Sequence, residues 1–239
     1  MSDTLYLSLW YPNLRIAALA GKLTAVLGAF AAHGGEKRVY SATVWPVSWN
    51  ESPVFEQVYG RRARAVGDET DENCIAELGA EPRLAVAEAL ELLHDDFAYE
   101  FQIGWSLWEL ENPTVNAGPS TSAAHAAFAQ DDSSYGHWTR QPRLVRVVGF
   151  GPLFDEATYE ADGHIRIDFG SDTPFLEEDL ELDSVAARHV EENVRQLVEL
   201  TAAVEKASGA TARILWSELG ESFAERLAAR LSKLAGRAN

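Results

Sequence analysis

The residues best suited to chemistry are concentrated in one stretch, residues 163–183. Its sequence, GHIRIDFGSDTPFLEEDLELD, contains seven acidic residues and one histidine. A Mg²⁺ ion often needs only one or two protein carboxylates, because water and substrate phosphates complete its oxygen shell. His164, Asp168, Asp172 and Glu178 are therefore candidate ligands or acid–base groups of a divalent-metal-dependent hydrolase or transferase.

The same stretch also has a structural interpretation without any metal. Ile165, Ile167 and Phe169 alternate with polar residues, which is typical of a strand with one buried face. Acidic residues that follow the strand and precede a long helix are favoured by the helix dipole. The sequence contains neither a Gly-x-x-x-x-Gly-Lys phosphate loop nor a Gly-x-Ser-x-Gly nucleophile elbow, so no complete catalytic motif decides between the two interpretations.

Aromatic residues at strand positions form the second candidate site. Tyr6, Trp10 and Trp108 fall opposite the main apolar stripes of their segments, and they would cluster if the first and fourth strands were neighbours. Together with Trp45 they are the predicted binding residues, because aromatic side chains dominate many protein interfaces. A further hypothesis is a small-ligand pocket lined by Trp45 and Trp105.

The charge of the chain restricts its partners. The sequence has 20 basic and 37 acidic residues, which gives a formal net charge of −17. Such a charge repels nucleic acids and anionic membrane surfaces and attracts a basic protein. The leading hypothesis is therefore a non-catalytic, acidic protein-binding or inhibitor-type module that needs no cofactor. Its oligomeric state stays open.

Composition also bears on location. Cys74 is the only cysteine, so an intramolecular disulfide is impossible, as is usual in a reducing compartment. The most apolar run, residues 16–32, is short and interrupted by Lys22 and Thr24, which argues against a membrane span. We expect a cytoplasmic protein, and the preference for arginine over lysine suggests a bacterial genome rich in G and C.

The pattern of apolar residues predicts the elements that position these candidates. Period-two alternation predicts strands and period-3.6 stripes predict helices. In the first half of the chain the expected order is strand, helix, strand, strand, helix, strand, over residues 5–10, 14–32, 37–45, 54–59, 83–94 and 99–107. This is the element order of a ferredoxin-like βαββαβ core, in which two helices cover one face of an antiparallel sheet.

The second half is expected to extend this core. Residues 112–142 are small and polar, which is typical of a flexible loop. After them we predict strands at 144–150, 164–169 and 212–216, and helices at 184–208 and 221–234. The fold class predicted for residues 1–239 is thus a single α+β domain: a ferredoxin-like core with an antiparallel sheet, extended by C-terminal strands and two helices.

Overall fold

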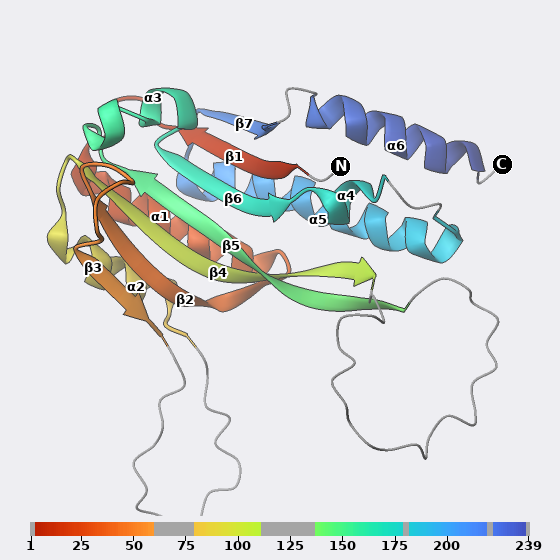
Figure 1. Ribbon diagram of the computed structural model, residues 1–239, viewed down its shortest axis with the longest axis horizontal. Coiled ribbons are helices and arrows are strands. Elements are labelled where there is room, and N and C mark those ends of the chain that lie inside the picture. The colour runs from red at the N-terminus through yellow and green to blue at the C-terminus, as the bar shows by residue number, and fades with distance from the viewer. Residues whose placement is uncertain (1–2, 60–78, 111–136, 179–181, 219–221, 238–239) are drawn as a thin grey trace, which may run out of the picture.

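A computed structural model describes residues 3–59, 79–110, 137–178, 182–218 and 222–237 (Figure 1). Seven strands form one antiparallel sheet in the order β3-β2-β4-β5-β6-β1-β7. The strands are β1 (Thr4–Trp10), β2 (Gly35–Pro46), β3 (Phe55–Val58), β4 (Phe97–Leu110), β5 (Trp138–Phe150), β6 (Ile165–Ser171) and β7 (Ala212–Ser217). The predicted α+β class with an antiparallel sheet is therefore confirmed.

The helices vary greatly in length. Their bounds are α1 (Ile16–Ala32), α2 (Pro82–Ala89), α3 (Tyr159–Asp162), α4 (Thr173–Leu176), α5 (Ser184–Ser208) and α6 (Phe223–Arg237), with 3₁₀ turns η1 (Leu90–Leu92) and η2 (Phe154–Glu156). The long helices α1 and α5 lie side by side behind the sheet in Figure 1. None of the helices in the described part of the chain is long and apolar enough to cross a membrane.

The main core lies between the sheet and these helices. Leu5, Leu7 and Leu9 of β1 are fully buried in it, as the alternation predicted. Gly149 of β5 also faces the helices, because a Cβ atom there would approach side-chain atoms of Leu19 and Leu23 to 3.0–3.1 Å. Successive residues on a strand point to opposite faces, so the residues on either side of Gly149 point away from the helices.

The strand order does not confirm the ferredoxin-like arrangement. In that arrangement the first strand belongs in the middle of the first four, whereas here β1 pairs with β6 and β7, and two strands lie between it and β4. The order of strands and helices in the first half of the chain was predicted correctly, but this order does not determine which strands pair. Pairing depends on contacts between segments that are far apart in the chain.

Local signals predicted several boundaries. Asp183 caps α5 by accepting hydrogen bonds from the backbone N–H groups of Val185 and Ala186. Gly209 ends the helix with a φ of 69°, which an L-residue with a side chain rarely adopts. Asn13 does not cap α1, because it lies in the left-handed region with a φ of 53°, and Arg15 takes the cap position without a side-chain hydrogen bond.

Two strands differ from the expected pattern. The register of β2 shifts between Val39 and Ser41, so Val39 joins the core with Ala42 and Val44 instead of sharing a face with Ser41. The strand β5 begins at Trp138, six residues before the predicted start at 144. The rest of the predicted flexible loop, up to residue 136, lies outside the described residues, as does Cys74.

Candidate binding surface

The face of the sheet opposite α1 and α5 carries the candidate site. Register places one residue from each strand in a continuous row across this face, namely Val58, Ser41, Gln102, Arg146, Asp168, Tyr6 and Trp216. A second row runs parallel to it through Glu56, Thr43, Glu100, Val148, Arg166, Ser8 and Ile214. All seven strands thus contribute residues to one face of the sheet, part of which is covered, because Val148 packs with Phe154 of η2 and Tyr159 of α3.

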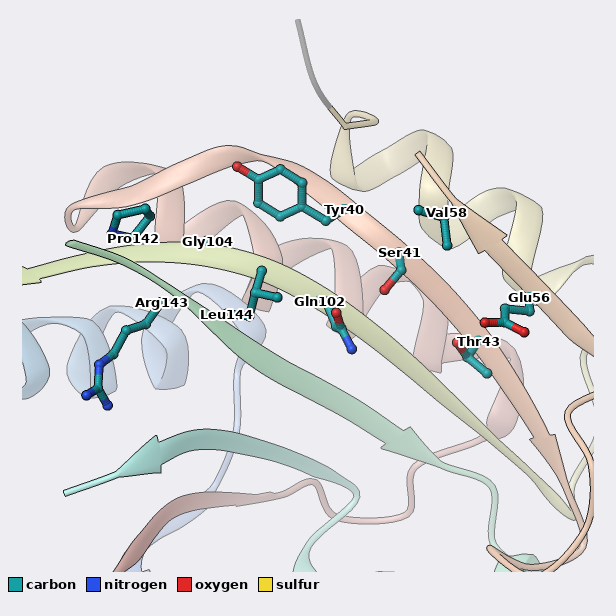
Figure 2. Close-up of a pocket in the computed structure, with 10 residues that line it drawn as sticks. All are labelled: Tyr40, Ser41, Thr43, Glu56, Val58, Gln102, Gly104, Pro142, Arg143 and Leu144. Atoms are coloured by element: carbon teal, nitrogen blue, oxygen red, sulfur yellow. The ribbon is translucent and has the colours of Figure 1, made fainter. Parts of the chain in front are cut away.

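A recess of about 590 Å³ opens on this face over β2, β3, β4 and β5. Figure 2 shows Ser41, Thr43 and Gln102 projecting from neighbouring strands along it. The other lining residues are Tyr40, Glu56, Val58, Gly104, Pro142, Arg143 and Leu144. Val58 and Leu144 are 66% and 58% exposed, so two aliphatic side chains stand in water beside hydroxyl and amide groups. That mixture suits a protein or peptide partner.

Two carboxylates near the recess have no described ion pair. Glu56 lines the recess, and Glu100 lies two strands away in the same row, on the other side of Thr43. Glu100 is only 8% exposed, and among the described residues neither carboxylate forms a salt bridge. Glu100 is still close enough to Arg146 for its charge to raise the pKa of that arginine, so Glu56 is the carboxylate of the recess without a described cationic neighbour.

The arginines of the same face are paired with other acids. Arg146 donates to Asp168 Oδ2 from Nε at 3.1 Å and from Nη2 at 2.5 Å. Burial alone would lower the pKa of Arg146, but the hydrogen bonds and charge of Asp168 raise it above the ordinary arginine value. Arg166 pairs with Asp162. Arg143 alternates with Leu144, so its side chain points to the other face of the sheet, where it pairs with Glu109.

The β1–β7 end of the face is closed by stacked rings. Tyr6 and Trp216 stack with their centroids 4.6 Å apart, and the Arg166 guanidinium lies 5.4 Å from the Tyr6 centroid. The Tyr6 hydroxyl donates to Glu218 Oε1 at 2.7 Å. Burial, followed by this hydrogen bond, raises the pKa of Tyr6 to about 12, so the hydroxyl stays protonated at neutral pH.

The predicted aromatic residues do not form one cluster, because β5 and β6 separate β1 from β4. Tyr6 lies on the face opposite α1 and α5, and Trp10 is half-buried opposite Ala212 at the end of β1. Trp45 packs into a small second core with Trp49, Phe150 and Phe154. Trp108 lies against α5, with its ring centroid 4.1 Å from that of His189.

The hypothesis of a ligand pocket between Trp45 and Trp105 has no geometric support. Trp105 is fully buried among the core rings Phe30, Phe169 and Phe175, and its indole Nε1 donates to the His33 carbonyl at 3.0 Å. Trp45 belongs to the separate core cluster, so the two indoles line no common cavity in the described structure.

The predicted metal ligands are divided among different partners. Asp168 pairs with Arg146, whereas Asp172 and Glu178 both bind Arg226 of α6, at 2.7 Å for Asp172 Oδ2 and 2.9–3.0 Å for the two Glu178 oxygens. His164 Nδ1 accepts a hydrogen bond from the Tyr11 backbone N–H at 3.2 Å.

Asp172 and Glu178 share the Arg226 guanidinium, whereas Asp168 and His164 have other partners. Burial lowers the pKa of His164. Hydrogen bonds from Arg226 lower that of Glu178. No group of three or more His, Cys, Asp or Glu side chains suited to a metal ion occurs within the described ranges.

Sequence reasoning missed the residues that line the recess. Ser41, Thr43 and Gln102 carry no motif, and their only signal is their position as the polar members of alternating strands. Arg146 had a clearer signal, because it interrupts the apolar run of β5 between Val145 and Val147. No protein-family model matches the sequence, and no curated protein or solved structure is significantly similar to it.

Proposed function

We propose that this protein is a non-catalytic binding protein whose sheet face opposite α1 and α5 holds a segment of a basic protein. The observation that carries the proposal is the recess over β2–β5, in which exposed aliphatic side chains adjoin hydroxyl, amide and carboxylate groups. Side chains on a pleated sheet are fixed by their register, so the surface is formed before the partner arrives.

The chemistry of the face favours cationic groups. Glu56 and Glu100 form no described ion pair, although Glu100 lies near Arg146, and the arginines of this face, Arg146 and Arg166, are each paired with an aspartate. The net charge of −17 would speed the approach of a basic partner and repel nucleic acids. Contact with Val58 and Leu144 would add apolar burial of roughly 25 cal/mol per Å². A cytoplasmic setting forms part of this proposal.

The test needs a defined probe and a matched variant. Peptides enriched from a displayed random library on the purified protein would be synthesised, and their Kd values measured by fluorescence anisotropy at low and high salt. Leu144→Arg places a cation beside the recess. Val198→Arg makes the same change at an equally exposed aliphatic residue, 56% against 58%, on α5 behind the sheet.

We expect the enriched peptides to be rich in lysine and arginine and to bind more weakly as salt increases. Leu144→Arg should raise their Kd at least about tenfold, which corresponds to about 1.4 kcal/mol, and Val198→Arg should leave it within about twofold. Equal losses in both variants would show that only the overall charge matters, and the proposal would fail.

The metal-dependent hydrolase or transferase stays an alternative prediction. It would use His164, Asp168, Asp172 and Glu178, and the carboxylates of the last two would have to release Arg226 before they could bind a cation. Calorimetric titration with Mg²⁺, Mn²⁺ and Zn²⁺ checks it. Specific binding that is lost in Asp172→Asn would support the metal site, and the absence of heat with all three ions would remove it.

A further inference from the structure

The strand β7 is an edge strand with an unusual composition for an edge. It pairs with β1 along its whole length without a register shift, and on its other side no described strand follows. Its sequence, ARILWS, contains neither proline nor lysine, which commonly protect a sheet edge, and Arg213 is its only charged residue. The opposite edge, β3, has only four residues, follows Pro53 and carries Glu56.

The direction of the backbone groups of β7 follows from the contacts of β1. The Leu9 carbonyl accepts from His164, on the β6 side, whereas the Trp10 carbonyl accepts from Thr211, on the β7 side. Backbone groups alternate in direction along a strand. The backbone N–H and C=O groups of Ser8 therefore point toward β7, and those of its register partner Ile214 point toward β1. Arg213 and Leu215, on either side of Ile214, direct their N–H and C=O groups away from β1.

We propose that a second copy of the chain pairs with this edge, antiparallel, β7 against β7, about a two-fold axis at Ile214. In this register Arg213 of each copy faces Leu215 of the other, and the two pairs exchange four backbone hydrogen bonds, two for each pair. The interface is isologous, as in most homodimers.

Side chains in this register are complementary. The two Ile214 side chains, each 54% exposed in the single chain, face each other directly at the axis. A pair of this type, without hydrogen bonds between its own backbone groups, brings Cα atoms to about 4.5 Å, the closer of the two antiparallel spacings. On the same face Ala212 of each copy lies opposite Trp216 of the other. The edge thus buries apolar groups against apolar groups.

The distribution of charge along β7 permits the contact despite the large net charge of the whole chain. Arg213 is the only charged residue of β7, and its Nη1 lies 2.9 Å from Glu205 Oε2 of the same chain. In the proposed register it faces a leucine and not the other arginine. The dimer would join both sheets into one and place the two faces that lie opposite α1 and α5 on the same side.

Cysteine crosslinking tests the register directly. In a Cys74→Ser background, Ile214→Cys places two thiols opposite each other at a Cα separation within the disulfide range of roughly 4.4–6.8 Å. The matched variant is Ala212→Cys, which is also exposed on the same strand. Its two copies would lie about 13 Å apart along the strand, four residues at roughly 3.3 Å each. After mild oxidation we expect covalent dimers from Ile214→Cys and none from Ala212→Cys.

Sedimentation measures the association itself. The unmodified protein should be dimeric at tens of micromolar, and Ile214→Lys, which places two ammonium groups at the axis, should be a folded monomer with an unchanged circular dichroism spectrum. Val198→Lys, at an equally exposed site on α5, should stay dimeric. A monomeric unmodified protein, or equal crosslinking at residues 212 and 214, would overturn the proposal.

Discussion

Asn193 offers the sharpest test of how α5 is fixed to the sheet. It is fully buried on α5, and its carboxamide bonds to two other elements. Its Oδ1 accepts from the Trp108 backbone N–H at 2.9 Å, while its Nδ2 donates to the carbonyls of Trp108 at 2.8 Å and Pro174 at 2.9 Å. Replacing Asn193 with leucine keeps a side chain of similar size but removes all three hydrogen bonds.

The expected loss of stability follows from the backbone groups that Asn193→Leu leaves without a hydrogen-bond partner. Three backbone groups lose their partner at about 1–2 kcal/mol each, so Asn193→Leu should lower the free energy of unfolding by about 3–6 kcal/mol. With a urea dependence of about 3 kcal/mol per molar, the midpoint of unfolding should fall by about 1–2 M. Equilibrium urea denaturation followed by circular dichroism measures both quantities.

Gln196→Met is the matched control on the same helix. Gln196 is also buried, but its Nε2 bonds only to Glu192 at 3.3 Å, and its Oε1 has no hydrogen-bond partner. Methionine of similar shape removes a buried polar atom and leaves no backbone group unpaired, so the cost should stay below about 1 kcal/mol. If Asn193→Leu cost as little as Gln196→Met, the reasoning from unpaired backbone groups would be refuted.

Two further predictions concern ionised groups. Arg226→Met should lower the free energy of unfolding in urea by about 3–5 kcal/mol, because Asp172, 1% exposed, would keep a buried charge without its cation; a loss below 1 kcal/mol would contradict this. Burial lowers the pKa of His164 in the folded state. The stability associated with the neutral imidazole is therefore fully present above the unfolded pKa of about 6.5. It is lost as the pH falls through the lowered folded pKa. Thermal unfolding between pH 7 and pH 4 should show this loss, and His164→Gln should show less of it.

Elements with a strong local pattern could be predicted. The stripe from Ala186 to Val204 identified α5, and Asp183 and Gly209 marked its ends. The alternation in β1 and β4 also predicted which of their side chains enter the core. In these elements local propensity, polarity pattern and capping all agree.

The pairing of the strands and the partners in the ion pairs could not be predicted from the sequence. β1 pairs with strands more than 150 residues away, and several strands offer the same alternating aliphatic face, so no local signal selects its neighbours. The start of β5 was missed because Thr139, Arg140 and Gln141 are polar and their strand is held by β4 alone. Likewise, the pairing of Asp172 with Arg226 joins residues 54 positions apart without a motif.

The place of β1 in the sheet has a consequence for biosynthesis. Both hydrogen-bonding edges of this leucine-rich strand are completed by β6 and β7, which end near residue 217. On a ribosome β1 would emerge before both partners and wait while the roughly 200 residues up to the end of β7 are translated, which at about 5–20 residues per second takes roughly ten seconds or more. During that interval the nascent chain would expose an unpaired apolar strand, and we expect it to depend on chaperones until the last strand leaves the exit tunnel.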